Sequence, residues 1–497
     1  MKITLALFSA ALLTSSLGLY AKDVTLTAPG TLATAVGDDV SLTTLKVTGP
    51  VDAADFHFIN SKLYSLQSLD LGSATVEAYS GVPVLASHLS ASAAGELPEY
   101  ALSGCRLTKL TLPEGLTAIG RGALNGTALS TVTLPESLRT IGVGAFAGSE
   151  LTKLTVPAAV TVDSLAFSGC TSLKEVTYGP ADVPYGAFKG CTSLSKFTDQ
   201  TPLVSIGASA FAGCTSLTEM DFPATLTTIG ASAFQSSGLK EADLSGAIRL
   251  KSIGAWAFAE CPELTGFVAG PALTAIGEGT FFCDDNLASI TLPEGLQTVP
   301  DYAFTNASAL TDGTIMANAT TSVGKYAYKG LTGIKEAFLS NGLIYIGDNA
   351  MEGMSSLETI HADEITDVPA LGSDVWLDVT QKDVTLNVPD DLSSKFASTA
   401  QWREFHIEGP TAIGSVVADD AAVAAVTARF DGRVLVVEAA SPLQAVTVAL
   451  TDGKTFTRTV SGNAVTARID TSHLSDNLYL VNVTLADGSK GQFKLVR

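Results

Sequence analysis

The sequence has few basic side chains for its length. Lysine and arginine number 29 against 50 aspartates and glutamates, so the 497-residue chain has a formal net charge of -21. Proteins that bind nucleic acid without regard to sequence neutralise phosphates with lysine and arginine, and anionic membrane surfaces attract the same side chains. The shortage of basic charge therefore argues against both kinds of partner, whereas an acidic surface keeps an exported protein soluble.

Long apolar runs are absent after the first 21 residues. The chain begins with Lys2, an apolar stretch from Ile3 to Leu13 and a small-residue end at Ala21, which is the pattern of a secretory signal peptide. The stretch is shorter than the roughly 20 residues that cross a membrane, and no cysteine follows it to carry a lipid anchor. We expect residues 1–21 to direct secretion and the mature chain to have no transmembrane segment.

Residues that build catalytic sites are scattered. None of the five histidines belongs to a His-Glu-x-x-His zinc motif: His57, His88, His361, His406 and His473. Ser209 and Ser232 lie in segments that approach the Gly-x-Ser-x-Gly nucleophile elbow, but both segments end in phenylalanine and recur with the repeat described next. We therefore expect no enzyme activity, no cofactor and no bound metal.

An internal repeat of about 23 residues occupies the middle of the chain. Twelve anchor positions, all alanine but one, recur at intervals of 21 to 24 residues: Ala101, Ala123, Ala145, Ala166, Ala187, Ala210, Ala233, Ala257, Thr280, Ala303, Ala327 and Ala350. This period lies in the range of leucine-rich repeats, whose units bury their apolar faces only by stacking on one another. The sequence predicts a solenoid and not a single globular core.

Each unit predicts one short strand and a turn. In the unit from Leu107 to Leu124, apolar and polar residues alternate over residues 110–112, and Pro113 ends the strand because proline cannot donate to a β ladder. Apolar residues then recur every three or four positions, which predicts a brief helical or 3₁₀ segment on the opposite side. The expected fold class is an α/β repeat solenoid with one short strand per turn, followed by a small all-β sandwich domain.

The residue three places before each anchor defines a bend. It is glycine in eight units, proline at Pro98, Pro184 and Pro300, and aspartate at Asp163. Proline fixes φ near -65°, so the position cannot require the left-handed backbone that glycine alone would suggest. Glycine and proline are two solutions to the same bend.

The cysteines share one position of the repeat. Five stand four residues after an anchor and Cys283 stands three after: Cys105, Cys170, Cys191, Cys214 and Cys261. A shared position favours small buried residues with free thiols. An even number in an exported protein leaves two alternatives open, a disulfide from Cys191 to Cys170 or to Cys214, and metal binding.

The pattern Leu-x-x-Leu-x-Leu-Pro followed by Leu-x-x-Ile-Gly-x-x-Ala-Phe-x-Gly-Cys resembles the BspA-like (LRR_5) leucine-rich-repeat family of bacterial surface proteins. It is most complete over residues 107–148 and 217–261, whereas Thr280 departs from it. The resemblance implies a plan of consecutive parts: a cap with divergent repeats over 22–96, the solenoid over 97–380, and a closing repeat and cap over 381–409.

The period changes after residues 410–425, which form a low-complexity linker. Residues 426–497 alternate apolar and polar residues between Asp-Gly turns, which predicts a small antiparallel β-sandwich. With its ending from Phe493 to Arg497, this segment resembles the carboxy-terminal sorting domain of the type IX secretion system of Bacteroidetes, although Asn477 replaces the usual glycine. That resemblance implies display on the outer-membrane surface of a Gram-negative bacterium, with or without cleavage of the domain.

The outward positions of the expected strands hold the candidate partner-binding residues. Threonines are common there, and the charges appear segregated, with lysines before acids: Lys109, Lys153, Lys196, Glu219, Asp221, Glu241 and Asp243. Like charges on neighbouring strands repel one another, so the acids indicate a basic partner or a cation. Exposed aromatics, which would suit a carbohydrate, are almost absent from these positions apart from Phe338.

These features predict a monomeric, non-enzymatic interaction protein that is secreted or on the cell surface, and the resemblance to BspA-like proteins implies that it is adhesin-like. Twelve strands about 4.8 Å apart extend roughly 55 Å, enough for the exposed face to hold an extracellular or host protein. Two alternatives stay open: a structural spacer without a saturable partner, and a secreted hydrolase.

Overall fold

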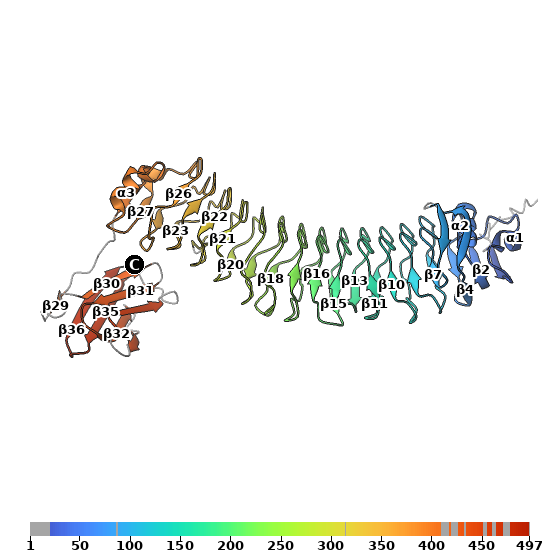
Figure 1. Ribbon diagram of the computed structural model, residues 1–497, viewed down its shortest axis with the longest axis horizontal. Coiled ribbons are helices and arrows are strands. Elements are labelled where there is room, and N and C mark those ends of the chain that lie inside the picture. Colours follow the sequence, from blue (N-terminus) through green and yellow to red (C-terminus); the bar gives the residue numbers. More distant parts are fainter. Residues whose placement is uncertain are drawn as a thin grey trace, which may run out of the picture. The chain divides into compact units, whose positions relative to one another are not determined.

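The computed structural model is a β-solenoid with few helices, as the sequence predicts (Figure 1). It describes residues 20–85, 88–313, 315–408, 417–418, 426–431, 434–450, 455–459, 464–470 and 478–496. Most of the expected signal peptide and of the expected linker lies outside the described residues. The chain divides into two compact units between Leu239 and Lys240, and each is described by itself below.

Unit 1 begins with a cap of strands and two helices. Its elements are β1 (Ala21–Thr25), α1 (Leu32–Val36), β2 (Thr44–Val51), α2 (Ala53–Lys62), β3 (Ser68–Asp70) and β4 (Ala74–Val76). Helix α2 begins where it does because Asp52 accepts the N–H groups of Ala54 and Asp55, while the carboxylate of Asp55 accepts the N–H of Asp52. The buried Asp55 carboxylate also accepts the N–H groups of Gly30 and Leu32, which ties the start of α1 to α2.

The coils of unit 1 contribute two rows of short parallel strands. The first strands carry the expected apolar alternation: β8 (Lys109–Thr111), β11 (Lys153–Val156), β13 (Glu175–Tyr178) and β15 (Lys196–Asp199). The second strands have two residues each and directly precede the bend: β7 (Glu96–Leu97), β9 (Ala118–Ile119), β10 (Thr140–Ile141), β12 (Thr161–Val162), β14 (Asp182–Val183), β16 (Ser205–Ile206) and β17 (Thr228–Ile229). Two residues are too few to show a period, so sequence analysis missed this second row.

Neither row of unit 1 is a continuous ladder. The first row pairs as β1-β2-β3-β8 and then as β11-β13-β15, with no strand over residues 131–133 between them. The second row pairs as β7-β9-β10-β12 and then as β14-β16-β17. Within the described coils of this unit, one row therefore continues wherever the other is interrupted.

Unit 2 also has two rows of short parallel strands, followed by closing turns. Its first strands are β18 (Glu241–Asp243), β19 (Gly266–Val268), β20 (Ser289–Thr291), β23 (Glu336–Phe338), β25 (Thr359–His361), β27 (Thr385–Asn387) and β28 (His406–Glu408). Its second strands are β21 (Thr298–Val299), β22 (Ser322–Val323), β24 (Tyr345–Ile346) and β26 (Ala370–Leu371). The closing turns contain η1 (Gln381–Asp383), α3 (Ser393–Ser398) and η2 (Trp402–Glu404), where Trp402 is buried against Trp376, Phe396 and Phe405.

The carboxy-terminal part of unit 2 is all β. It contains β29 (Val417–Ala418), β30 (Val426–Asp431), β31 (Val434–Ala439), β32 (Leu443–Leu450), β33 (Thr455–Thr459), β34 (Thr466–Asp470), β35 (Leu478–Leu485) and β36 (Lys490–Val496). These strands form two antiparallel sheets, β29-β36-β35-β32-β33 and β30-β31-β34. Residues of both sheets, Leu435 and Val446 among them, share one buried core.

The brief helical segments expected at the Ala-Phe pairs are not formed. Turns replace them, with left-handed residues directly before the anchor and three residues after it, such as Gly144 (φ 60°) and Gly148 (φ 67°) around Ala145. A left-handed residue interrupts right-handed helical hydrogen bonding, so the chain folds back at each end of the turn. The turns align the phenylalanines that follow the anchors, and five rings of unit 1 stack with centroids 5.4–5.6 Å apart: Phe146, Phe167, Phe188, Phe211 and Phe234.

The bend before each anchor does not require a left-handed residue, because Gly120 and its counterparts have no positive φ. Glycine is favoured there because the backbone of the preceding coil lies too close to leave room for a side chain. A Cβ atom on Gly120 would lie 2.8 Å from the carbonyl oxygen of Leu97 in the coil before it, and the Gly120 N–H donates to that oxygen. Proline at the same position has no N–H to donate.

The three prolines at the bend coincide with ends of the second-row ladders. Pro98 follows β7, Pro184 follows β14 and Pro300 follows β21, and each of these strands is the first of its sheet. Because a proline removes the hydrogen bond to the preceding coil, its position in the repeat marks where a new ladder begins.

Candidate interaction surface

The lysines selected from the sequence lie on first-row strands of unit 1. Lys109 (β8), Lys153 (β11) and Lys196 (β15) are exposed, and the residue after each points inward. Leu110 and Leu154 are buried there, at 7% and 3% exposure. The alternation of a strand thus places one residue in the core and its two neighbours on the outward face.

The expected segregation of charge is wrong in this part of the face. Glu175 lies opposite Lys153 on one side and Lys196 on the other. The Lys153 Nζ is 2.9 Å from a carboxylate oxygen of Glu175, and this hydrogen bond and charge, with a smaller effect of Lys196, lower the pKa of Glu175. Lys153, Glu175 and Lys196 therefore form a row of alternating charge, and such exposed pairs contribute little to stability.

The four selected acids lie in two pairs, one in each unit. Glu219 and Asp221 are exposed in unit 1, in a segment that forms no strand. Glu241 and Asp243 are the exposed ends of β18 in unit 2, opposite Gly266 and Val268 of β19. Hydrogen bonds from the side chain and from the backbone N–H of Ser245 to the Asp243 carboxylate lower the pKa of Asp243.

Sequence analysis did not identify a cluster on the outward face of unit 2. Phe338 of β23 and His361 of β25 stack with ring centroids 4.4 Å apart, and Asn387 of β27 is next in register. Carboxylate oxygens of Glu336 and Asp363 each lie 3.7 Å from a nitrogen of His361. These residues come from three coils, so only the repeat register brings them together. The outward strand position of Phe338, which is half-buried in the structure, was the one signal in the sequence.

Half-buried aromatic rings also line the turns of unit 2. Trp256 and Tyr302 have ring centroids 6.2 Å apart, and Tyr302 stacks on Tyr326 at 5.2 Å. All three residues are left-handed and directly precede an anchor. The scarcity of aromatics expected for the outward strand positions therefore does not extend to the turns.

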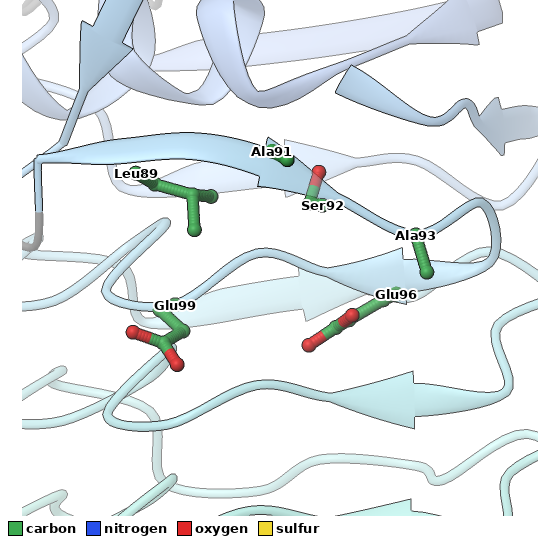
Figure 2. A pocket seen from close by; sticks show the side chains of 6 residues that line it. All are labelled: Leu89, Ala91, Ser92, Ala93, Glu96 and Glu99. Atoms are coloured by element: carbon green, nitrogen blue, oxygen red, sulfur yellow. The ribbon is translucent and has the colours of Figure 1, made fainter. Parts of the chain in front are cut away.

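A cleft of about 340 Å³ lies in unit 1, beside a hairpin of β5 (Tyr79–Val84) and β6 (Leu89–Ser92) (Figure 2). Its lining combines small and apolar residues with two carboxylates: Leu89, Ala91, Ser92, Ala93, Glu96 and Glu99. Among the described residues, no group of three or more His, Cys, Asp or Glu side chains is placed to hold a metal ion. No helix in the described part of the chain is long and apolar enough to cross a membrane.

Residues 95–183, 181–311 and 251–375 match the BspA type leucine rich repeat region, which together is more than half of the chain. No curated protein sequence matches it. A leucine-rich repeat protein from Bacteroides ovatus is 19% identical with a TM-score of 0.52, and the match covers 73% of this chain and 87% of that one. At this identity the similarity shows the fold alone.

Two other solved structures are similar with lower scores. A leucine-rich repeat protein from Eubacterium ventriosum is 18% identical with a TM-score of 0.36, over 62% of this chain and 88% of that one. A leucine rich cell surface protein from Faecalibacterium prausnitzii is 18% identical with a TM-score of 0.24, over 46% of this chain and 85% of that one.

Proposed function

Because the chain belongs to the BspA type leucine-rich repeat family, we propose that it is a non-enzymatic interaction protein of the cell surface. In this proposal it is adhesin-like and binds an extracellular protein through the outward face of its first-row strands. The family match and the repeat fold support an interaction role, and the name of the Faecalibacterium prausnitzii protein supports a surface location.

One observation carries the proposal: the outward residues of the first row are exposed or half-buried and differ in charge between coils, whereas their inward neighbours are apolar. Lys109 and Thr111 flank the buried Leu110, and Glu241 and Asp243 flank Ala242, which is 1% exposed. Substitutions at the outward positions therefore leave the packing of the core unchanged. The pattern of these outward side chains can then determine which partner the protein binds.

A binding screen against extracellular-matrix proteins tests the proposal. The chain is compared with a Glu241→Lys/Asp243→Lys variant, a Glu219→Lys/Asp221→Lys variant, and a Ser289→Lys/Thr291→Lys control that adds positive charge at the outward positions of β20. If a basic partner binds the acids, we expect at least a tenfold rise in Kd for one acidic variant and a smaller change for the control.

Other results of the screen would revise the proposal. Unchanged binding by both acidic variants would remove the four acids from the interaction surface. Absence of any saturable partner would favour the second candidate, a structural spacer. The ion pair of Lys153 with Glu175 also favours a spacer, because these two charges are paired within the chain. No observation favours the hydrolase.

A further inference from the structure

The hairpin of β5 and β6 interrupts the solenoid of unit 1 between β4 and β7. Its strands pair only with each other among the described residues, with Tyr79 opposite Ser92 and Ser80 opposite Ala91. In an antiparallel pair, alternate residues direct their N–H and C=O groups away from the partner strand. Strand β6 therefore has an edge with backbone groups free to pair.

The neighbouring coil also ends a ladder. Strand β7 is the first strand of its sheet, and the N–H of Gly95, which donates to the carbonyl of Val76, joins this coil to that of β4. At the next bend, Pro98 has no N–H to donate to the preceding coil. Its counterpart Gly120, by contrast, donates its N–H to the carbonyl oxygen of Leu97. The second row thus breaks beside the hairpin.

The cleft shown in Figure 2 lies at this break. Strand β6 runs along one side of it with Leu89 pointing inward, and the coil that carries Glu96 and Glu99 forms the other side. Both glutamates are half-buried, and neither has an ion-pair partner within the described part of the chain. The cleft therefore joins an unpaired strand edge to two uncompensated carboxylates.

We propose that this cleft binds an extended basic segment of a partner protein by strand addition. The backbone of the segment pairs with the edge of β6, and lysine or arginine side chains on one side of it reach Glu96 and Glu99. Neighbouring residues of a strand point to opposite sides, so a segment with a basic residue at every second position fits. This site is separate from the outward strand face and does not depend on the function proposed above.

Charge argues against two other occupants. An acidic segment or a small anion would meet Glu96 and Glu99 with the same sign of charge. A second copy of β6 pairing with the same edge would bring Leu89, Ser90, Ala91 and Ser92, which contain no basic residue, and would place two more glutamates nearby. A basic segment compensates the charge that the cleft leaves unpaired.

The experiment measures binding of fluorescent peptides to the full mature chain by anisotropy, at low and high salt. The probe alternates valine and lysine, and the comparison peptide alternates valine and glutamate. The test variant is Glu96→Gln/Glu99→Gln, and the matched control is Glu114→Gln/Glu136→Gln, which removes the same charge from exposed glutamates outside the cleft. We expect the lysine peptide to lose at least tenfold in affinity with the test variant and less than twofold with the control.

Strand addition is tested separately with the protein unchanged, using lysine peptides N-methylated at odd or at even positions. We expect one set to abolish binding and the other to preserve it, because only one edge of the peptide pairs with β6. Equal binding of both methylated peptides would overturn strand addition. Equal binding of the glutamate peptide, an equal loss with the control variant, or no saturable binding of the lysine peptide would overturn the proposal as a whole.

Discussion

The position four residues after each anchor is a small buried site in successive coils. In unit 1 it holds the half-buried Cys105 and the buried Thr127, Ser149, Cys170, Cys191, Cys214 and Ser237. The thiols of Cys170, Cys191 and Cys214 donate to the carbonyl oxygens of Phe146, Phe167 and Phe188 at 3.1–3.2 Å. All six cysteines have free thiols in this structure, and burial raises the pKa of Cys214 to about 12, so these side chains fill space and satisfy carbonyls.

Asp284 occupies the same position in unit 2 and predicts a pH-dependent stability. It is 0% exposed, one oxygen accepts the Cys261 N–H at 2.7 Å, and the other has no hydrogen-bond partner. Burial raises its pKa to about 8, whereas an unfolded aspartate ionises near pH 4. The neutral carboxyl therefore stabilises the folded state fully below about pH 4, and this stabilisation is lost as the pH rises through about 8.

Asp284→Cys, which installs the residue found in neighbouring coils, should raise the Tm most at high pH. Each pKa unit corresponds to roughly 1.4 kcal/mol, so we expect the fall in Tm between about pH 5 and about pH 8.5 to shrink by several degrees. The control Glu294→Gln changes an exposed carboxylate that does not contribute to the pKa shift of Asp284, and it should leave that fall unaltered. An equal pH dependence in Asp284→Cys and the native chain would disprove the assignment.

The short distance between the bend and the backbone of the preceding coil gives a second prediction, which compares two glycines of one coil. Gly120→Ala places a Cβ 2.8 Å from the Leu97 oxygen, whereas Gly115→Ala meets nothing within 4 Å. We expect Gly120→Ala to lower the free energy of unfolding by about 1–3 kcal/mol, and Gly115→Ala to be neutral or slightly stabilising. Thermal and urea unfolding measure both; equal effects would refute the packing explanation.

Among the structural elements, the first-row strands and the bend are the features that the sequence predicts. Leu110 and Leu154 reveal their strands because three or four alternating residues are enough to show a period. The Ala-Phe spacing resembles a helical period, but left-handed residues turn these segments into turns. Where such a residue is not glycine, as at Trp256, the sequence carries no obvious signal of its backbone conformation. The hairpin of residues 79–92 lies outside the repeat and has no counterpart by which to recognise it.

The candidate surface was predictable only in part. The outward positions of Lys153 and Glu241 follow from strand alternation, but the pairing of Lys153 with Glu175 depends on which residues the register places opposite each other. The same register creates the stack of Phe338 on His361. A single unit shows which residues point outward; neighbouring coils decide which of them meet.

The phenylalanine stack tests whether stability is local to neighbouring coils. Phe188 is fully buried between Phe167 at 5.4 Å and Phe211 at 5.6 Å. Phe188→Ala should cost about 3–5 kcal/mol, and in a stacked array the loss should concentrate in the adjoining coils. Hydrogen exchange should show lost amide protection around residues 161–211 and little change in β2.

The matched control for this variant is Tyr185→Ala, which removes a ring that is 48% exposed in the same coil and should change protection little. If Phe188→Ala instead lost amide protection uniformly throughout unit 1, the unit would unfold in an all-or-none manner.

For the whole molecule, we propose that the all-β segment directs export across the outer membrane, in keeping with its resemblance to type IX sorting domains. Deletion of residues 434–497 in the producing bacterium should leave the chain in the periplasm, as measured by fractionation and surface protease accessibility. The Glu241→Lys/Asp243→Lys variant, which keeps this segment, should reach the surface normally. Normal display of the truncated chain would contradict a sorting role.

The offset of the ladder ends in unit 1 has a mechanical consequence. The first row is interrupted near residues 131–133, where β9, β10 and β12 remain paired, and the second row is interrupted at Pro184, where β11, β13 and β15 remain paired. A tensile load along this stretch of coils therefore meets a hydrogen-bonded strand row at each joint. Hydrogen bonds between strands of successive coils point from one coil to the next, so pulling any two coils of this stretch apart requires breaking at least one row of backbone hydrogen bonds.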